Sequence, residues 1–502
     1  MIPIIAPKKI KILEKNYLLK FKNKEILQNR AVKGIVKIIL NQKPSEVIIF
    51  FGPGMNGKDG LKAGKLISKK IGSEKVTLVS CIAGRSSKEN LNFAKDEGIK
   101  IYEFDKNFLT KKSKSKNKNI IILDSILGIS AKGNLRGHIS NKVEFINKKF
   151  YKKENIKIYS LDIPTGFDPN NGNINRNTVK SDEVIMLGSQ VMASVIKPDV
   201  FKKINYVDLG FKKNNLTDTR VIYEALTLSF AKNKFTQRSE TSYKNKFGSH
   251  LIIGGSEKYP GAALLSSRSS NISGTGHTSI FTSEKIIKNI IKNTPETTFF
   301  KSSFDDQSSF KKYTSLSIGV GLDQNKDSKK TIYAFLEYIQ STKNIHNIII
   351  DADALNILSS INYWWECLPR STLVTPHIGE FNRIYKFKNY ESIFEKLINF
   401  SKLTRLCILL KGPSTLIAQN NEVIVNTAPN GGMSKPGMGD VLTGLIGGLA
   451  SLPKIKVKDA AIVGTYVHSE AGRLSRKIKG STSMTASDVI SFIPQVFKNL
   501  EK

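Results

Sequence analysis

The segment VIIFFGPGMNGKDGLKAGKLI, residues 47–67, places an apolar run, a glycine-rich turn and a helical pattern in direct succession. The run VIIFF predicts a buried strand, because short apolar runs bounded by glycine are typical of parallel sheets. Gly52, Gly54 and Gly57 then allow backbone N–H groups to approach a ligand at the start of a helix. This order of elements predicts an α/β fold with a ligand beyond the carboxyl end of this strand.

The same glycines fit two nucleotide-binding patterns, G-x-G-x-x-G and G-x-x-x-x-G-K, and the chain completes neither of them. A P-loop requires Ser or Thr after its lysine to hold Mg²⁺, whereas Asp59 follows Lys58 here. A dinucleotide site requires an acid at the end of the next strand, whereas that strand ends VSCIAG. The loop therefore predicts a nucleotide-like ligand that is bound in neither familiar way.

The bulk composition restricts the class of protein. A length of 502 residues with 40% hydrophobic content favours two or more domains with well-filled cores. The net charge of +36 would suit a nucleic-acid binder, but the basic residues are scattered and no recognition motif accompanies them. We therefore favour compositional drift and expect no specific nucleic-acid partner. Three cysteines without C-x-x-C spacing argue against a disulfide framework and against a zinc site.

The chain shows no targeting or membrane segment. Its start lacks the pattern of a signal peptide, and its longest apolar run, Val441–Leu452, is too short to span a bilayer. We expect a cytoplasmic protein with no membrane partner, assembled as a homo-oligomer.

Strand-like runs alternate with helical stretches in both halves, which predicts two α/β domains built on parallel sheets. In the first half the runs are EVIIFF (46–51), KVTLVSC (75–81), NIIILD (119–124), IKIYSLDIP (156–164) and DEVIMLG (182–188). In the second half they are HLIIGG (250–255), SLSIGVG (315–321), NIIIDAD (347–353), STLVTP (371–376) and RLCILLKG (405–412). We expect a doubly wound domain at residues 1–212, a linker at 213–240 and a second domain at 241–502.

Three strand ends of the first half carry polar residues, in GPGMNGKDG (52–60), LDSILGIS (123–130) and LDIPTGFDPNNG (161–172). The carboxyl ends of parallel strands meet at one edge of a sheet, where ligands bind. The sequence therefore predicts one crevice that gathers Asn56, Asp59, Asp124, Asp162 and Thr165.

These three motifs resemble the N-terminal epimerase domain of NAD(P)H-hydrate repair enzymes, a Rossmann-like fold, over about residues 25–211. The resemblance implies that Asn56, Asp124 and Thr165 ligate K⁺ and that Asp162 is the acid/base at the hydrated nicotinamide ring. It further implies a substrate-binding set that consists of Met55, Asn56, Gly57, Lys58, Asp59, Gly128 and Asp162.

The first half departs from the family pattern at several of these positions. Met55 and Lys58 replace an Asn and a Gly, and Thr165 replaces a Ser while keeping the hydroxyl. Val191 stands where the family usually has a Lys, three residues after Gly188. Proton transfer needs a group of suitable pKa, so the absence of that Lys could weaken or abolish epimerisation. The alternative is that the domain is kept for packing or ligand binding only.

In the second half, NGGMSKPGMGDVLTGLIGGLA (430–450) places a glycine-rich turn before an apolar helix that Asp440 is expected to open. N–H groups at such a helix start form an anion hole, and a carboxylate beside them can accept a proton from a hydroxyl. The alternative for Asp440 alone is an ordinary helix cap. LKGPSTLIA (410–418) offers a lysine and two hydroxyls at a strand end, and His377 in TPHIGEFNRI (375–384) could touch a polar substrate or serve structure only.

Taken together, KFGSHLIIGGSEKYPGAA, IGVGLD, DADALNIL, TPHIGEF, LKGPST and PGMGDVLTG resemble, in this order, the ADP-dependent NAD(P)H-hydrate dehydratase domain, a ribokinase-like fold. The match covers about residues 238–495. It implies that Ala262, Gly321, His377 and Asp440 contact the substrate, with Asp440 catalytic. The residues implied to bind the adenine nucleotide are Lys411, Gly412, Pro413, Ser414, Thr415 and Gly439.

The resemblance implies repair of hydrated NADH and NADPH (NADHX and NADPHX). The first domain would interconvert the R and S forms, and the second would dehydrate the S form with ADP or ATP and Mg²⁺. Phosphorylation would turn the ring hydroxyl into a good leaving group. Two alternatives remain: a ribokinase-type small-molecule kinase with a non-catalytic N-terminal domain, and a basic nucleic-acid-binding scaffold with a decayed core.

Overall fold

The structure is a computed structural model. It describes residues 2–502 apart from 6, 22–24, 83–88, 97, 114–117, 132–134, 136, 170–173, 175, 212–221, 239–240, 302–306, 343–346 and 386–392. The chain divides into two compact units, Met1–Thr219 and Arg220–Lys502.

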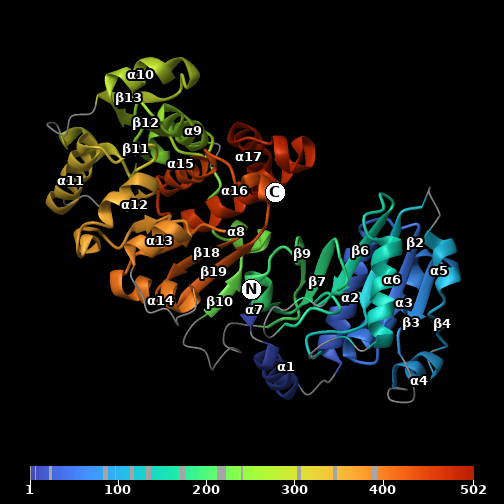
Figure 1. The fold of residues 1–502 in the computed structure, drawn as a ribbon. Helices are drawn as coiled ribbons and strands as arrows, with labels where there is room; N and C mark the ends of the chain where they lie inside the picture. The colour runs from blue at the N-terminus through green and yellow to red at the C-terminus, as the bar shows by residue number, and fades with distance from the viewer. Residues whose placement is uncertain are drawn as a thin grey trace. The chain divides into compact units, whose positions relative to one another are not determined.

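The first unit is built on a seven-stranded sheet in which every pairing is parallel (Figure 1). Its strands, in spatial order, are β4 (Tyr102–Glu103), β3 (Val76–Ser80), β2 (Glu46–Phe51), β5 (Ile120–Ser125), β6 (Ile156–Leu161), β7 (Glu183–Leu187) and β9 (Ile204–Val207). The order reverses between β2 and β5, and ligands of open α/β sheets bind at such a switch point.

Helices cover both faces of this sheet, which confirms the doubly wound prediction. They are α1 (Pro7–Phe21), α2 (Ile26–Leu40), α3 (Met55–Ile71), α4 (Glu89–Asp96), α5 (Lys106–Ser113), α6 (Gly137–Phe150) and α7 (Met192–Ile196). In β2, Val47, Ile49 and Phe51 pack with α1 to α3, whereas Ile48 and Phe50 pack with α5 and α6. Successive residues of a strand point to opposite faces, so a strand covered on both faces must be apolar throughout.

The second unit contains a ten-stranded sheet with a mixed edge. In spatial order its strands are β10 (Ile222–Ala225), β19 (Glu422–Thr427), β18 (Ser414–Gln419), β17 (Cys407–Leu410), β16 (Thr372–Val374), β15 (Asn347–Ile350), β14 (Ser315–Ile318), β11 (Ser249–Ile253), β12 (His277–Thr282) and β13 (Thr298–Lys301). Only β18 runs antiparallel to its neighbours. The ten strand-like runs read from the sequence all lie on strands, and the strands that were not predicted are short or lie toward the sheet edges.

Helices of the second unit also lie on both faces, with α15 and α16 on one and α11 to α14 on the other (Figure 1). The helices are α8 (Leu228–Lys232), α9 (Pro260–Asn271), α10 (Glu284–Ile290), α11 (Lys326–Ser341), α12 (Ala352–Leu358), α13 (Ile378–Ile384), α14 (Ile393–Thr404), α15 (Met438–Ala450), α16 (Val457–Ser483) and α17 (Ala486–Glu501). The apolar helix α15 packs between α9, α16 and the centre of the sheet.

The expected linker at 213–240 differs from the structure. Residues 222–225 form β10, which pairs in parallel with β19, and residues 228–232 form α8, whose Ala231 lies in the core. Polar composition concealed this edge strand, although Glu224 and Ala225 are buried. Residues 213–221 and 239–240 lie outside the described part of the chain.

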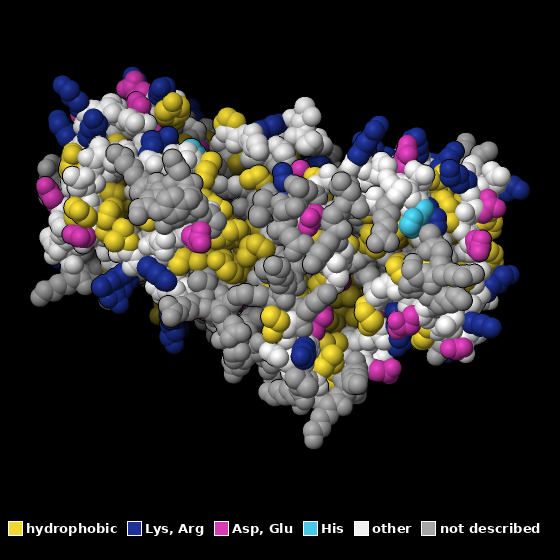
Figure 2. All heavy atoms as spheres, turned by 60° about the horizontal axis from the view of Figure 1, so that its bottom comes forward, with side chains coloured by type: hydrophobic (Ala, Val, Ile, Leu, Met, Phe, Trp, Pro, Cys, Tyr) yellow, Lys and Arg dark blue, Asp and Glu magenta, His cyan; other side chains and the backbone are white. Residues whose placement is uncertain are grey.

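Charge shows no dominant surface on the visible side. Figure 2 shows Lys and Arg side chains in small groups over both units, interspersed with Asp and Glu. Within the described residues, no helix is both long and apolar enough to cross a membrane.

Candidate active sites

A cavity of about 660 Å³ lies at the carboxyl edge of the first sheet, beside the switch between β2 and β5. The loops after β2 and β5, the start of α3, and side chains from α1 and α2 form its wall. The lining residues are Glu14, Leu18, Leu27, Gln28, Ala31, Pro53, Gly54, Met55, Asn56, Asp59, Ile126, Leu127, Gly128, Ile129, Ser130, Ala131, Asp162, Leu187 and Leu209.

Asp162 reaches this cavity from the end of β6. Its backbone adopts φ 61°, its N–H donates to the carbonyl of Ile185 at 2.7 Å, and Leu187 N–H donates to its Oδ1 at 3.3 Å. Burial, together with the charges of Asp59 and Glu14, raises the pKa of Asp162 to about 8. The carboxyl group is therefore mostly protonated at neutral pH and can give up a proton.

Asp59, on the first turns of α3, is the second acid of the cavity. Its side chain is buried, and Gln28 Nε2 donates to its Oδ1 at 2.8 Å. Burial raises the pKa of Asp59 to about 6, while the hydrogen bond from Gln28 opposes the rise. At neutral pH the cavity thus combines a mostly ionised carboxylate with a mostly protonated one, which is a usable acid–base pair.

Behind the cavity, Asp124 is fully buried at the end of β5. Its oxygens accept hydrogen bonds from Thr165 Oγ1 at 2.7 Å, Thr165 N–H at 2.9 Å and Ser160 Oγ at 2.9 Å. These donors are all neutral, and burial raises the pKa of Asp124. Asn56 uses its Nδ2 to donate to two backbone carbonyls, while its buried Oδ1 has no hydrogen-bond partner.

This group of oxygens fits a potassium ion. A buried carboxylate served only by neutral donors, next to an amide oxygen with no donor, lacks one positive charge. Carboxylate, amide and hydroxyl oxygens are also the ligands that hard cations prefer. A bound K⁺ would neutralise Asp124 and satisfy Asn56 Oδ1, and it would fix the wall of the cavity on which Asn56 lies.

The remaining residues implied for the first site divide into two groups. Met55 and Gly128 line the cavity, whereas Gly57 and Lys58 do not. A Cβ on Gly57 would lie 2.0 Å from the carbonyl oxygen of Gly52, so this glycine is required for the turn itself. Lys58 faces away, with its Nζ 3.8 Å from Glu89 Oε1.

Val191 lies in β8 (Gln190–Val191), which pairs with β1 (Ile4–Ile5), and its side chain is packed in the core. It does not line the cavity. The backbone at this position therefore turns away from the ligand space.

Sequence reasoning missed Glu14 and Leu18, which α1 brings to the cavity, and Gln28 from α2. No motif marks these positions. The available signal was weak: in α1, Leu13 and Tyr17 form an apolar stripe that is buried in the core and therefore docks the helix.

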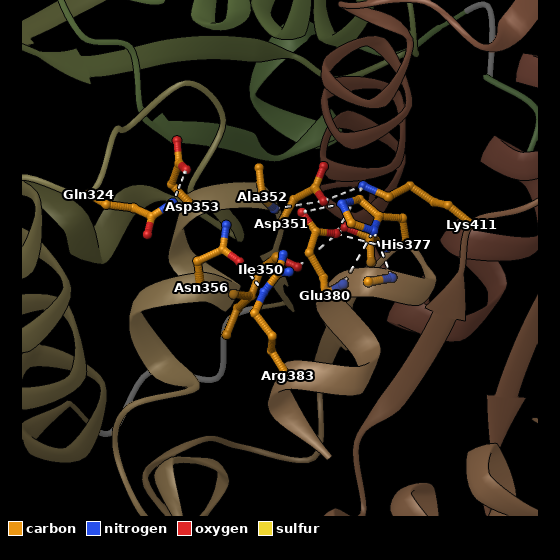
Figure 3. A network of polar contacts seen from close by, with 12 residues as sticks. Gln324, Ile350, Asp351, Ala352, Asp353, Asn356, His377, Glu380, Arg383 and Lys411 are labelled. Atoms are coloured by element: carbon orange, nitrogen blue, oxygen red, sulfur yellow. Dashed lines mark hydrogen bonds and ion pairs between the residues drawn. The ribbon is translucent and has the colours of Figure 1, made fainter. Parts of the chain in front are cut away.

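The second site lies at the carboxyl ends of β15 and β17 (Figure 3). Lys411 Nζ donates to Asp351 Oδ1 at 2.6 Å and lies 3.9 Å from Glu380 Oε2. Thr443 Oγ1, from α15, donates to Asp351 Oδ2 at 2.6 Å. Nearby carboxylates raise the pKa of Lys411 even though burial lowers it, so this lysine stays charged.

Asp440 is the third residue of α15, which begins at Met438 rather than at Asp440 as expected. Gly437 precedes the helix at φ 88°, where a side chain would be strained. Burial and the charge of Asp351 raise the pKa of Asp440, the charge of Lys411 opposes this rise, and the net pKa is about 6. Asp440 is thus mostly ionised at neutral pH and can accept a proton.

Gly439 lies against the buried lysine. A Cβ built on this glycine would be 3.6 Å from Lys411 Nζ and 3.9 Å from Asp351 Oδ2. The first turn of α15 therefore places free N–H groups, a cation and a carboxylate around one space, which can bind a phosphoryl group and deprotonate a hydroxyl.

His377 caps α13. The N–H groups of Gly379 and Glu380 donate to His377 Nδ1 at 3.0 Å and 3.2 Å. In return, the backbone N–H group of His377 donates to Glu380 Oε2 at 2.8 Å. The side chain remains 53% exposed. The cap holds Glu380 toward Lys411. The His377 side chain thus caps α13 while one edge of its imidazole ring stays exposed to solvent.

The other implied residues lie around this centre. A Cβ on Gly321 would be 2.6 Å from that of Ala262, so these two residues adjoin. Asp323 N–H donates to Asp353 Oδ2 at 2.9 Å, and the charge of Asp353 also raises the pKa of Asp440. In the nucleotide-binding set, Gly412 and Pro413 are exposed, and Ser414 and Thr415 begin β18 half-buried.

Sequence reasoning assigned no role to Asp351 or Asp353, although DADALNIL contains them, and it gave Glu380 only a possible contact with a polar substrate beside His377. It also missed His468 on α16, whose ring donates to the carbonyl of Met438 at the start of α15. The motifs marked the segments, but the contacts that give these residues a role form only across separate strands.

Two families match the chain. The family described as "YjeF-related protein N-terminus" matches residues 24–190, and "NAD(P)H-hydrate dehydratase" matches residues 250–495. Curated relatives named "Bifunctional NAD(P)H-hydrate repair enzyme Nnr" include one from Methanocaldococcus jannaschii, 28% identical over 99% of this chain and 94% of the relative. Another, from Dictyoglomus turgidum, is 27% identical over 89% and 88%.

Among solved structures, a hypothetical protein from Streptococcus mutans superimposes with a TM-score of 0.51 at 21% identity. It covers 55% of this chain and 100% of its own. That likeness supports the α/β fold.

Proposed function

From the premise that the chain belongs to the family of bifunctional NAD(P)H-hydrate repair enzymes, we propose that it restores hydrated NADH and NADPH to NADH and NADPH. The first unit interconverts the R and S forms of the hydrate. The second unit dehydrates the S form with an adenine nucleotide.

In the first unit, the hydrated ring occupies the cavity beside Asp162 and Asp59. Asp162 gives a proton to the ring hydroxyl, and ionised Asp59 stabilises the positive charge that forms on the ring. Asn56, Asp124 and Thr165 would hold K⁺, which would supply the positive charge that the buried carboxylate lacks. Met55 and Gly128 form the wall around the ring, while Gly57 shapes the turn.

In the second unit, Asp440 accepts the proton of the ring hydroxyl as that oxygen attacks the terminal phosphate of ADP. Lys411 and the N–H groups of Gly439 and its neighbours bind the phosphate charge. Loss of the phosphate ester with a ring proton then forms the double bond, and AMP and phosphate are released.

The other proposed contacts of the second unit are inferred from residues that lie around the site of Lys411 and Asp440. Ala262, Gly321 and His377 border the substrate, and the turn Gly412–Thr415 contacts the nucleotide. Among the described residues, no three His, Cys, Asp or Glu side chains are arranged to hold a metal by themselves. Mg²⁺ commonly binds through phosphates and one or two carboxylates, so it would enter with the nucleotide beside Asp440.

The observation that carries this proposal is the partly buried contact of Lys411 with Asp351 beside the first turn of α15, near an Asp440 that is mostly ionised at neutral pH. A site for an uncharged substrate alone would have no use for a cation held among carboxylates. The same observation suits a ribokinase-type kinase, in which the transferred phosphate stays on the product.

The test uses a mixture of R- and S-hydrates of NADH with ADP and Mg²⁺, and follows the recovery of reduced-nicotinamide absorbance. An enzyme-free sample measures spontaneous epimerisation. We expect full recovery faster than that control, with one AMP and one phosphate per NADH. A stop after the S form is consumed would restrict the proposal to the second unit, and a stable phosphorylated product would favour the kinase.

A further inference from the structure

The first cavity has an unusual charge pattern. Three carboxyl groups line it, those of Glu14, Asp59 and Asp162, and no lysine or arginine occurs among its described lining residues. The start of α3 lines one side of this pocket and can hold a phosphate. The carboxyl groups favour a neutral group that acquires positive charge, because carboxylates stabilise a cation within their reach.

A second observation shows that the cavity is built for a ligand. Asn56 is only 7% exposed and lines the same cavity, yet its Oδ1 has no hydrogen-bond partner. Buried polar atoms are almost always satisfied in folded proteins. The unsatisfied Oδ1, which a cation behind the wall would satisfy, and the three carboxyl groups that line the space of about 660 Å³ both mark this part of the fold as a ligand site.

Glu14 enters this space from a helix that is firmly docked. Its neighbours Leu13 and Tyr17 are buried in the core, and Arg30 Nη1 donates to Tyr17 Oη at 2.8 Å. The charge of Glu14 reaches Asp162, whose pKa it helps to raise. Glu14 comes from α1 and Asp162 follows β6, so two separate elements bring these carboxyl groups to the cavity.

We infer that Glu14 is a further catalytic residue of the first unit, which takes a proton from the water that adds to the hydrated ring. This inference rests on the proposed epimerase function. Glu14, on α1, supplies the carboxylate that accepts a proton, while Asp162 donates one. No lysine occurs among the described residues that line the cavity.

The reaction balances without any co-reactant. Asp162 gives a proton to the ring hydroxyl as the C–O bond breaks, water leaves, and the ring nitrogen shares its electron pair to form a C=N⁺ bond. Water then adds to the other face of that carbon and passes a proton to Glu14. The proton returns from Glu14 to Asp162 through solvent, and the product is the opposite epimer. The cationic ring is the species that the carboxylates stabilise.

The test measures conversion of the purified R-hydrate to the S-hydrate by the full chain in K⁺ buffer without ADP, with the epimers separated by chromatography. Without ADP the second unit is silent. We expect Glu14→Gln to lower kcat by roughly 10²-fold, the lower end for loss of an acid–base group, and to change KM little. Glu14→Asp, which keeps a carboxylate, should retain more activity than Glu14→Gln.

The matched control is Glu154→Gln, which removes an exposed carboxylate outside the cavity and should leave kcat unchanged. Wild-type kcat in Glu14→Gln, or a loss confined to KM, would overturn the inference while the epimerase function stands. A wild-type rate equal to the enzyme-free control would overturn both. If Glu14→Gln lowers the unfolding midpoint, the comparison between Glu14→Asp and Glu14→Gln decides the inference.

Discussion

Both units place carboxyl groups at an equivalent position of their sheets, beyond the carboxyl ends of parallel strands and beside a helix start. The two sites differ in whether a basic side chain accompanies these carboxyl groups. The first cavity has three carboxyl groups and no basic side chain among its described lining. The second site holds Lys411 within 4 Å of both Asp351 and Glu380. The difference teaches that one basic side chain changes what a similar scaffold favours. Carboxyl groups alone favour a ligand that acquires positive charge, and a lysine held among them favours an anion such as phosphate.

The largest effect should come from Asp440→Asn, which removes the proton acceptor of the second site and keeps its shape. We expect dehydration of the S-hydrate to fall by about 10²–10⁴-fold, while epimerisation by the first unit is unchanged. Steady-state assays of both activities on the same preparation measure this. Asp327→Asn, at an exposed position on α11, is the control, and equal losses in both variants would contradict the assignment.

Lys411→Gln tests the cation that distinguishes the two sites. We expect KM for ADP to rise by about 10–100-fold, because a buried charge-assisted contact with phosphate is worth roughly 1.5–3 kcal/mol. Since Lys411 lowers the pKa of Asp440, the acid limb of the dehydration rate should also move to higher pH. Lys458→Gln, which removes a lysine paired with Glu422 far from the site, should change neither quantity. An unchanged KM for ADP in Lys411→Gln would show that the nucleotide does not bind at Lys411.

The pH profiles of the two activities should show opposite limbs. Dehydration needs ionised Asp440, whose pKa is raised to about 6, so its rate should fall below pH 6. Epimerisation needs protonated Asp162, whose pKa is raised to about 8, so its rate should fall above pH 8. Each rate should drop about tenfold per pH unit beyond its limb, and kcat/KM measured from pH 5 to pH 9.5 checks both. If both rates changed with pH in the same way, the assignment of Asp440 as proton acceptor and Asp162 as proton donor would be contradicted.

The smallest effect concerns stability. His250 is fully buried between Ser270 Oγ at 2.8 Å and Ser317 Oγ at 2.7 Å, and burial lowers its pKa to about 3. A lowered histidine pKa gives stability that is present above pH 6.5 and lost as pH falls toward 3, by roughly 1.4 kcal/mol per pH unit.

Denaturant unfolding of the full chain between pH 6.5 and pH 4 measures this slope. His250→Gln should make it shallower, although the variant is less stable at pH 7 because the buried pair of hydrogen bonds changes. His138→Gln, at an exposed position of the first unit, should leave the slope unchanged. Buried carboxyl groups of the first unit, such as Asp162, carry the opposite sign, because a raised carboxyl pKa favours folding at lower pH.

Much of this protein could be read from its sequence. Strands such as EVIIFF are apolar at every position because both faces are covered, so their pattern fixes a parallel sheet. Turns such as GPGMNGKDG and PGMGD place glycine where no side chain fits, as at Gly437 with φ 88°. The order of these motifs identified the family and both candidate sites, because each motif lies within one strand–turn–helix unit.

Only the tertiary structure decided which side chains meet. Glu14 reaches the first cavity through the docking of α1, and Val191 turns into the core through the pairing of β8 with β1. Lys411 meets Asp351 across 60 positions of chain. Local sequence determines local conformation, but such meetings depend on how separate elements pack, and the same packing removes the water that would otherwise keep carboxyl pKa values ordinary.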